Sequence, residues 1–232
     1  MSQFKKTIVI ALGGSLVFPD EIDVQFLIKF KLLIEGFLKQ KYRFILVTGG
    51  GKICRKYNDA VKKLNPQAID KELDWMGIKS TKVNAELVRI MFGTNAYYKV
   101  LDSPDEKLRK QFNRPIILSG GWKPGRSTDY VAVALAQNFK AQEVIIMTNV
   151  DYVYTADPKK DPQAQPIKEL NWSQYRKMFG VKWVPGLNIP VDPQASKLAQ
   201  KNRQKVVYIK GSNLANFKDY LSGSKFIGTV IF

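Results

Sequence analysis

Histidine is absent from the 232 residues, and cysteine occurs only once, as Cys54. Without histidine the chain has no Ser-His-Asp or Cys-His catalytic unit, no histidine general base and no histidine-liganded zinc. A single cysteine excludes an intrachain disulfide and argues against a cysteine-based metal site. Any chemistry must therefore use lysine, arginine, aspartate and backbone amides, together with magnesium where phosphates are bridged.

Long apolar runs are also missing, so no segment has the length of a membrane span. The first residues, Met1–Lys6, lead directly into a strand pattern and lack the features of a signal peptide. We therefore expect a cytoplasmic protein without a membrane partner.

Acidic residues are scarce relative to basic ones, at 20 Asp and Glu against 37 Lys and Arg, which gives a net charge of +17. Such a balance fits nucleic acid, an anionic membrane surface or small phosphorylated substrates. The basic residues are scattered and form no long block, so a solvated basic surface explains most of them. An apolar content of 45% in a chain of this length is enough for a substantial core.

Apolar runs alternate with helical patterns along the whole chain. Strands are expected at residues 6–12, 43–48, 96–101, 115–119, 144–147, 205–209 and 226–232. Helices are expected at 24–38, 52–64, 70–92, 104–112, 128–139, 171–179, 192–202 and 213–221, with Gly77 a point of distortion and 180–191 a loop. The alternation predicts one mainly parallel sheet covered on both faces, with the last strand antiparallel.

Three glycine turns each follow a predicted strand. They are Gly13-Gly14 after 6–12, Gly49-Gly50-Gly51 after 43–48, and Gly120-Gly121 after 115–119. Glycine lets backbone N–H groups approach an anion closely, and a following helix N-terminus adds partial positive charge. Because the carboxyl ends of parallel strands meet at one edge, the three turns predict a single phosphate-binding crevice.

The ordered set of motifs resembles the amino-acid kinase family and, within it, the archaeal-type UMP kinases. The matching segments are Leu12-Gly13-Gly14-Ser15, Thr48–Lys52 with Arg55, Asp74–Ile78, Gly120–Asp129, and Thr148–Asp151 through Tyr154–Pro158. The resemblance implies a three-layer α/β/α sandwich, phosphorylation of UMP by ATP with Mg²⁺ held mainly by phosphates, and a homohexamer. It also implies a single domain over 1–232, with 1–140 on the acceptor side and 141–232 on the ATP side.

For the acceptor, the resemblance places Gly50 at the UMP phosphate and Asp74 at the ribose. A loop would wrap the UMP with Trp122, Lys123, Pro124, Gly125, Arg126, Ser127 and Thr128. Asp129 would organise the phosphate-binding groups. Arg55 would lie nearer the ATP side and pair with phosphate oxygens in the bidentate way that lysine cannot.

For the donor, the resemblance implies contacts with ATP from Ala11, Leu12, Gly13, Gly14, Ser15, Gly51, Arg55, Thr148, Asn149, Tyr154 and Asp157. Asp157 would lie near the ribose and Tyr154 near the base. The polar, proline-punctuated loop that carries these two residues is long, and long loops in compact domains are often functional.

Two positions depart from the family pattern. Ala11 stands where many members carry a catalytic lysine, so Lys52, at the second glycine turn, becomes the first candidate for that cation. Tyr152 stands where glycine is usual and adds a ring beside the proposed base site, which predicts an altered nucleotide preference. Asp129, Arg55 and Lys52 are thus the candidate catalytic residues.

Three alternatives stay open. The chain could be a kinase of this fold for another small acceptor, although the absent histidine and Ala11 weigh against isopentenyl phosphate and acetylglutamate. It could be a non-catalytic nucleotide-sensing or storage protein, which Ala11 favours. Specific nucleic-acid binding has only the net charge behind it, and no recognition motif accompanies that charge.

Overall fold

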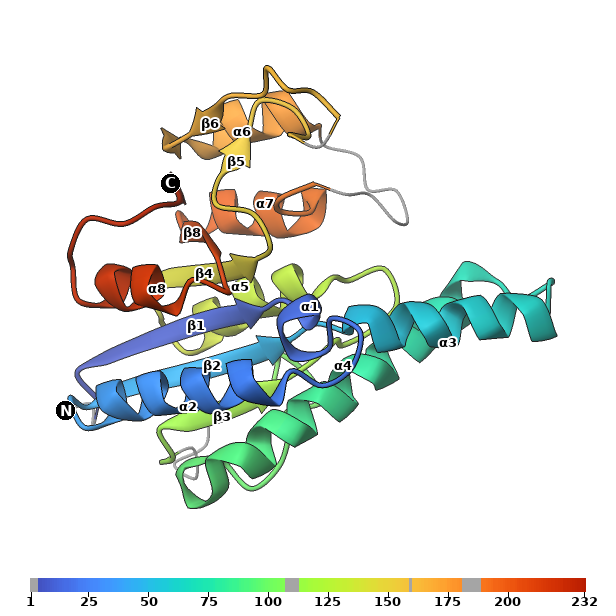
Figure 1. The fold of residues 1–232 in the computed structure, drawn as a ribbon, viewed down its shortest axis with the longest axis horizontal. Coiled ribbons are helices and arrows are strands. Elements are labelled where there is room, and N and C mark those ends of the chain that lie inside the picture. The colour runs from blue at the N-terminus through green and yellow to red at the C-terminus, as the bar shows by residue number, and fades with distance from the viewer. Residues whose placement is uncertain (1–3, 107–112, 159, 181–188) are drawn as a thin grey trace.

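A computed structural model describes residues 4–106, 113–158, 160–180 and 189–232 (Figure 1). Its centre is a seven-stranded sheet in the order β3-β2-β1-β4-β8-β9-β7. The five strands at one end of this order are mutually parallel; they are β1 (Lys6–Leu12), β2 (Tyr42–Thr48), β3 (Ile116–Ser119), β4 (Glu143–Thr148) and β8 (Lys205–Lys210). Because they are parallel, β1, β2, β3 and β4 end at the same edge.

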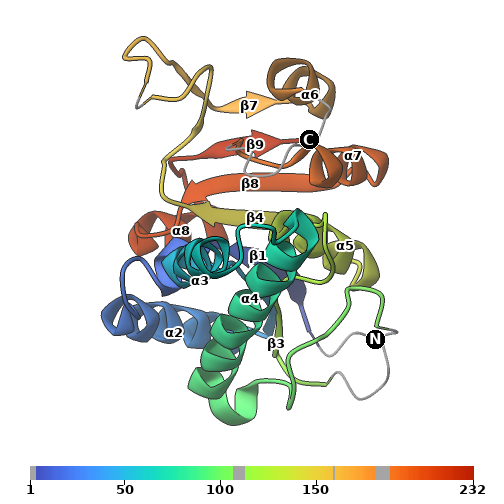
Figure 2. The same cartoon turned by 90° about the vertical axis from the view of Figure 1, so that its right-hand side faces the viewer.

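Helices cover both faces of this sheet (Figure 2). One face carries α5 (Thr128–Asn138), α6 (Trp172–Phe179) and α7 (Pro193–Lys201); the other carries α2 (Val24–Leu38), α4 (Asp70–Phe92) and α8 (Leu214–Leu221). Alternate strand residues point to the two layers: Val9 packs with the first set, and Ile8 and Ile10 with the second. This burial on both faces is why the strands are continuously apolar rather than alternating. The predicted α/β class with a mainly parallel, doubly covered sheet is confirmed.

The last strand, β9 (Thr229–Ile231), pairs antiparallel with β8, as the sequence indicated, and parallel with β7 (Glu169–Leu170). It is shorter than the predicted 226–232. The prediction of a strand at 96–101 is wrong, because only isolated bridges join Ala96 to Ile116 and Leu101 to Ser119. Between these bridges the chain bends, so no continuous ladder forms along β3.

Helix α4 runs unbroken through Gly77 from Asp70 to Phe92. The predicted helix at 104–112 and the loop at 180–191 extend over residues 107–112 and 181–188, which lie outside the described part of the chain. The long polar loop after β4 contains a small two-stranded sheet, β5 (Val153–Tyr154) with β6 (Pro166–Ile167), that the sequence pattern did not predict. Two short helical segments were also missed, α1 (Gly14–Val17) and η1 (Gly93–Asn95).

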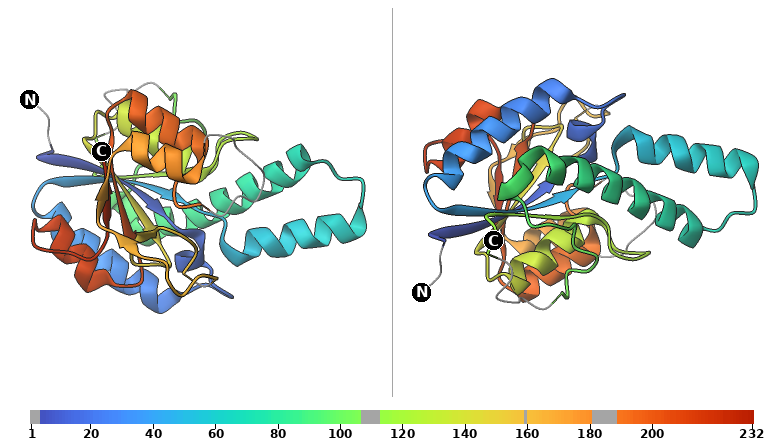
Figure 3. Two further views of the ribbon diagram at one scale, coloured as in Figure 1. Left: turned by 90° about the horizontal axis from the view of Figure 1, so that it is seen from above. Right: turned by 90° about the horizontal axis from the view of Figure 1, so that it is seen from below.

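Helix α3 (Gly51–Leu64) and the first half of α4 form a hairpin that projects from the body of the molecule (Figure 3). No residue of α3 is buried. Over the described ranges, no helix is both long and apolar enough to cross a bilayer.

Candidate active site

The first two glycine turns are in direct contact at the carboxyl ends of β1 and β2. A Cβ atom added to Gly14 would lie 2.0 Å from the Gly51 nitrogen, so only glycine fits there. Gly49 N donates a hydrogen bond of 2.9 Å to Leu12 O, and Gly13 N donates one of 3.0 Å to Met147 O. The ends of β1, β2 and β4 are thereby joined through backbone atoms.

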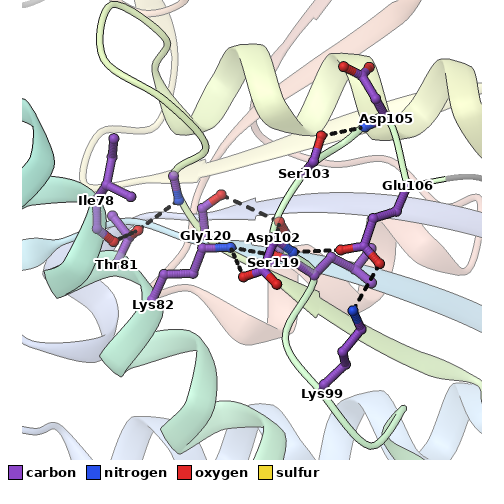
Figure 4. Close-up of polar contacts among 12 residues, drawn as sticks. Ile78, Thr81, Lys82, Lys99, Asp102, Ser103, Asp105, Glu106, Ser119 and Gly120 are labelled. Carbon is purple, nitrogen blue, oxygen red and sulfur yellow. Dashed lines mark hydrogen bonds and ion pairs between the residues drawn. The ribbon is translucent and has the colours of Figure 1, made fainter.

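Polar side chains of α4 fix the second and third turns from behind. Asn84 Nδ2 donates to Gly49 O at 2.8 Å and to Gly50 O at 3.2 Å. Thr81 Oγ1 accepts a 2.7 Å hydrogen bond from Gly121 N and donates to Ile78 O (Figure 4). Both α4 side chains are buried, so these bonds are sheltered from water. All three turns therefore lie at one edge of the sheet, as the sequence predicted.

Lys82 of α4 and the loop between α4 and β3 add further polar contacts near the third turn (Figure 4). The Lys82 ammonium donates to Leu101 O and lies 3.8 Å from Asp102 Oδ1. Burial lowers the pKa of Lys82, which the nearby acidic groups partly oppose. Lys82 thus contacts the loop that precedes β3 and does not line the cavity beside the glycine turns.

A cavity of about 560 Å³ opens beside the turns, and we call it the strand-end cavity. A volume of this size suits a nucleotide-sized ligand. Eleven predicted site residues line it: Ala11, Leu12, Gly13, Gly14, Ser15, Thr128, Asp129, Thr148, Asn149, Tyr154 and Asp157. The structure thus brings together residues that lie up to 146 positions apart in the sequence, because the strands that carry them are neighbours in the sheet.

Tyr152, which the sequence indicated as a ring beside the base site, lines the cavity and stands edge-on to Tyr154, with ring centroids 6.2 Å apart. Other lining residues were not among the predicted contacts, and one of them, Tyr208, reaches the cavity from β8. The remaining ones are Gly49, Ile146, Met147, Val150, Thr155, Ala156, Pro158, Met178, Phe179, Ile189 and Pro190. Val150, Thr155, Ala156 and Pro158 lie within the segments that carry the family resemblance, whereas Met178, Phe179, Ile189 and Pro190 lie outside those segments, so the motifs carried no signal for them.

Among the carboxyl groups that line the cavity, Asp129 has the pKa that departs most from its ordinary value. Desolvation, and next the nearby Asp192 carboxylate, raise its pKa to about 7. It occupies the first turn of α5, one residue after Thr128. Burial also raises the pKa of Tyr208 to about 12, so that its hydroxyl stays protonated and can donate to Thr148 Oγ1 at 3.3 Å.

Of the residues that the resemblance assigned to UMP, only Thr128 lines the strand-end cavity, and the others lie outside its lining. Asp74 Oδ2 accepts a 2.8 Å hydrogen bond from Gly125 N, and the Ser127 hydroxyl caps α5 by accepting from Tyr130 N at 3.0 Å. We name the stretch from Trp122 to Ser127 the 122–127 loop. Gly50 is the residue before α3 and adjoins this region through α4.

Cations in the 122–127 loop stack on rings rather than pairing with carboxylates. Lys123 Nζ lies 3.9 Å from the Trp122 ring centroid, and the Arg126 guanidinium carbon lies 4.7 Å from that of Tyr130. Arg126 Nε is buried without a hydrogen-bond partner. Pro124 completes the loop turn, with Gly125 at φ 75°.

Besides the residues assigned to UMP, three further predicted residues lie outside the cavity lining. Lys52 forms an ion pair with Asp20, and its side chain is 43% exposed. Arg55 is exposed on α3, and Gly51 lies behind Gly14 with φ 67°. The described residues contain no group of three or more acidic, cysteine or histidine side chains able to hold a metal ion.

Parallel strands that end in interlocked amide turns beside a nucleotide-sized cavity define a phosphate-binding α/β protein. Its family follows from comparison: the family model described as "Amino acid kinase family" matches residues 6–210. This chain belongs to the amino acid kinase family.

Relatives extend over nearly the whole chain. A uridylate kinase of Thermococcus onnurineus is 32% identical over 97% of this chain and 98% of that protein. A uridylate kinase of Methanospirillum hungatei is 33% identical over 97% of this chain and 94% of that protein. The crystal structure of uridylate kinase from Archaeoglobus fulgidus superposes with a TM-score of 0.82 at 32% identity, covering 97% of this chain and 99% of that one. A UMP kinase from Bacillus anthracis, at 20% identity and a TM-score of 0.79, shares the fold.

Proposed function

We propose that this protein is a UMP kinase, which transfers the γ-phosphoryl group of ATP to UMP and yields UDP and ADP. Support comes from relatives named uridylate kinase that match almost end to end, and from their structural counterpart at a TM-score of 0.82. The observation that carries the proposal is the contact between Gly14 and Gly51, because it brings two amide-lined turns to one point.

The chemistry needs alignment more than acid–base catalysis. An oxygen of the UMP phosphate attacks the γ-phosphorus, and the bond from that phosphorus to the β–γ bridging oxygen breaks, so ADP leaves. The attacking phosphate is already ionised at neutral pH, and no general base is required. Mg²⁺ bound to the phosphates would neutralise part of their charge. The absence of histidine is compatible with this reaction.

The strand-end cavity fits the donor. The backbone amide of Gly14 would face the phosphates, since that of Gly13 is bonded to Met147 O. Asp157 would face the ribose, while Tyr152 and Tyr154 offer aromatic faces for a base. Asp129 would organise the groups at the phosphate without taking a proton.

The 122–127 loop fits the acceptor. Arg126 carries a buried, unpaired Nε, which is an available donor for an anion, and Asp74 has a second carboxylate oxygen for ribose hydroxyls. Gly50, just before α3, would meet the acceptor phosphate, and Arg55 on α3 would pair with phosphate oxygens nearer the ATP side. Lys52 remains our candidate for the cation that stabilises the transferred group, although in this structure it is paired with Asp20.

Release of ADP in a coupled assay with Mg-ATP and a panel of nucleoside monophosphates tests the function. We expect turnover to be highest with UMP. Nucleotide binding without turnover of any acceptor would instead support the sensing or storage alternative. Turnover with a different small phosphate or carboxylate would keep the kinase and reject UMP.

We further propose a homo-oligomer, a hexamer by resemblance, that works in the cytoplasm in pyrimidine nucleotide biosynthesis. Large apolar side chains exposed on α4, Val83 at 62% and Ile90 at 61%, provide surface for contact between copies. Light scattering on a sizing column should give a mass near six times 26.4 kDa. A monomer mass at micromolar concentration contradicts the assembly.

A further inference from the structure

The 122–127 loop is held at Gly125 from two sides. Its N–H donates to Asp74 of α4 at 2.8 Å, and its carbonyl oxygen accepts from Gln194 Nε2 of α7 at 3.1 Å. The same carbonyl accepts from Arg126 at 3.2 Å. Since Gly125 has φ 75°, its conformation is open to glycine and strained for other residues, and the two helices together hold it there.

The first turn of α7 also holds the end of this loop. The Ser127 hydroxyl donates to Asp192 Oδ2. The other carboxylate oxygen of Asp192 caps α7, accepting from Gln194 N at 2.8 Å and Ala195 N at 3.1 Å. One carboxylate therefore orders the helix turn that presents Gln194 and binds the loop end at the same time.

The residues directly before this turn form a wall of the strand-end cavity. Ile189 and Pro190 line it, and Val191 is fully buried. Val191 N donates to the Tyr175 hydroxyl at 2.6 Å, and that hydroxyl donates to Val191 O at 2.8 Å. Tyr175 is itself buried in α6, so the cavity wall and the start of α7 are fixed as one unit.

We propose that Gln194 is a positioning residue that couples the two substrate sites, by linking the 122–127 loop to the segment that walls the strand-end cavity. A ligand in the cavity packs against Ile189 and Pro190, which are fixed to the start of α7, so it stabilises the position of Gln194, and Gln194 holds Gly125 in its binding conformation. Coupling of this kind is reciprocal, so the acceptor also tightens donor binding. The inference rests on the proposed function for the identity of the two ligands.

Hydrogen–deuterium exchange tests the link without an acceptor. The probe is AMP-PNP with Mg²⁺, and the readout is exchange in peptides that cover the 122–127 loop. In the wild type we expect the analogue to slow this exchange about three- to tenfold, the range that one hydrogen bond supplies. In Gln194→Leu, which keeps the volume and removes the donor, the slowing should vanish.

Gln200→Leu is the matched control, because Gln200 is exposed on the same helix and bonds Arg176, not the loop. It should behave as the wild type. Gln194→Met is a second variant with the same loss of the donor, and melting curves confirm that each variant is folded. Equal slowing in the wild type and in Gln194→Leu, or no slowing in the wild type, overturns the coupling.

Steady-state kinetics separate the coupling from the function. Gln194→Leu should raise KM for UMP about three- to tenfold and leave kcat within about twofold. A fall in kcat with unchanged KM contradicts a positioning role. A wild type that slows exchange with AMP-PNP but never phosphorylates UMP keeps the coupling and rejects UMP as the acceptor.

Discussion

The strand-end cavity and the 122–127 loop hold their residues by different means. One wall of the cavity consists of strand ends and glycine turns whose backbones bond to one another, such as Gly49 to Leu12 and Gly13 to Met147. The loop is fixed by single side chains that reach it from α4 and α7, namely Asp74, Asp192 and Gln194. A backbone framework tolerates most side-chain changes but no added Cβ, whereas a side-chain framework responds to the loss of one donor.

Gly14→Ala should produce the largest effect, because it breaks the backbone side of this comparison. The new Cβ would lie 2.0 Å from Gly51 N, so the two turns must separate. We expect kcat/KM for UMP phosphorylation to fall by about 100-fold or more, since misplacement by about 1 Å can cost that much. Gly36→Ala is the control. Gly36 lies in the last turn of α2, where an added Cβ meets nothing within 4 Å, and the change should stabilise the protein slightly. Near-normal activity in Gly14→Ala would show that the contact is dispensable.

Asp129→Asn examines the residue at the border of the two regions. With its pKa raised to about 7, folded Asp129 keeps its proton between about pH 4 and 7 while the unfolded chain loses it. Stability therefore falls as pH rises through this window and levels off above it. The variant lacks this loss, so its free energy of unfolding should exceed that of the wild type by about 2 kcal/mol at pH 8 and by less at pH 5. A pKa shift of this size in a fully desolvated group would give a larger difference, but the Asp129 carboxyl borders an open cavity, where solvent reduces the effect.

Urea denaturation at the two pH values measures this difference. Asp219→Asn, at an exposed position on α8, serves as the control and should follow the wild type at both. Parallel pH dependence of Asp129→Asn and the wild type would refute the raised pKa.

Lys52→Met tests whether the hairpin contributes to catalysis. If the ammonium leaves Asp20 to meet the transferred group, its removal should lower turnover at saturating UMP by about tenfold. Lys62→Met, farther along α3, should retain wild-type turnover. A turnover of Lys52→Met close to that of the wild type removes this lysine from the mechanism. If the ion pair with Asp20 competes with the transferred group for the Lys52 ammonium, Asp20→Asn should raise turnover.

Tyr152→Ala should give the smallest effect of these variants, and it tests how much a single side chain contributes to the strand-end cavity. Loss of one aromatic face is expected to raise KM for ATP about threefold, because a stacked aromatic contributes about 0.5–1.5 kcal/mol. Tyr152→Phe keeps the ring and should match the wild type. The ratio of kcat/KM for ATP and GTP reports nucleotide preference, and an unchanged ratio in Tyr152→Ala would exclude a role for this ring in choosing the base.

Periodicity predicted the elements that bury a face, such as β1, β2 and α4, because a buried strand or an amphipathic helix leaves a long apolar pattern. It failed at 96–101, where the run is apolar but the pairing partner, β3, bonds only its two ends. Short elements such as β5 and β6 have too few residues for a period. Their pairing, Val153 with Ile167, is set by the folded loop.

Local sequence determined that three strand ends carry glycine turns, that no histidine chemistry occurs, and that the chain resembles a known family of kinases. It could not show that Gly14 rests on Gly51, that burial and then Asp192 raise the pKa of Asp129, or that Gln194 reaches Gly125. Local backbone preferences depend on near neighbours in the chain, which the sequence displays. These three contacts join residues 37 to 69 positions apart, so they depend on sheet order and helix placement, and only the tertiary structure decides those.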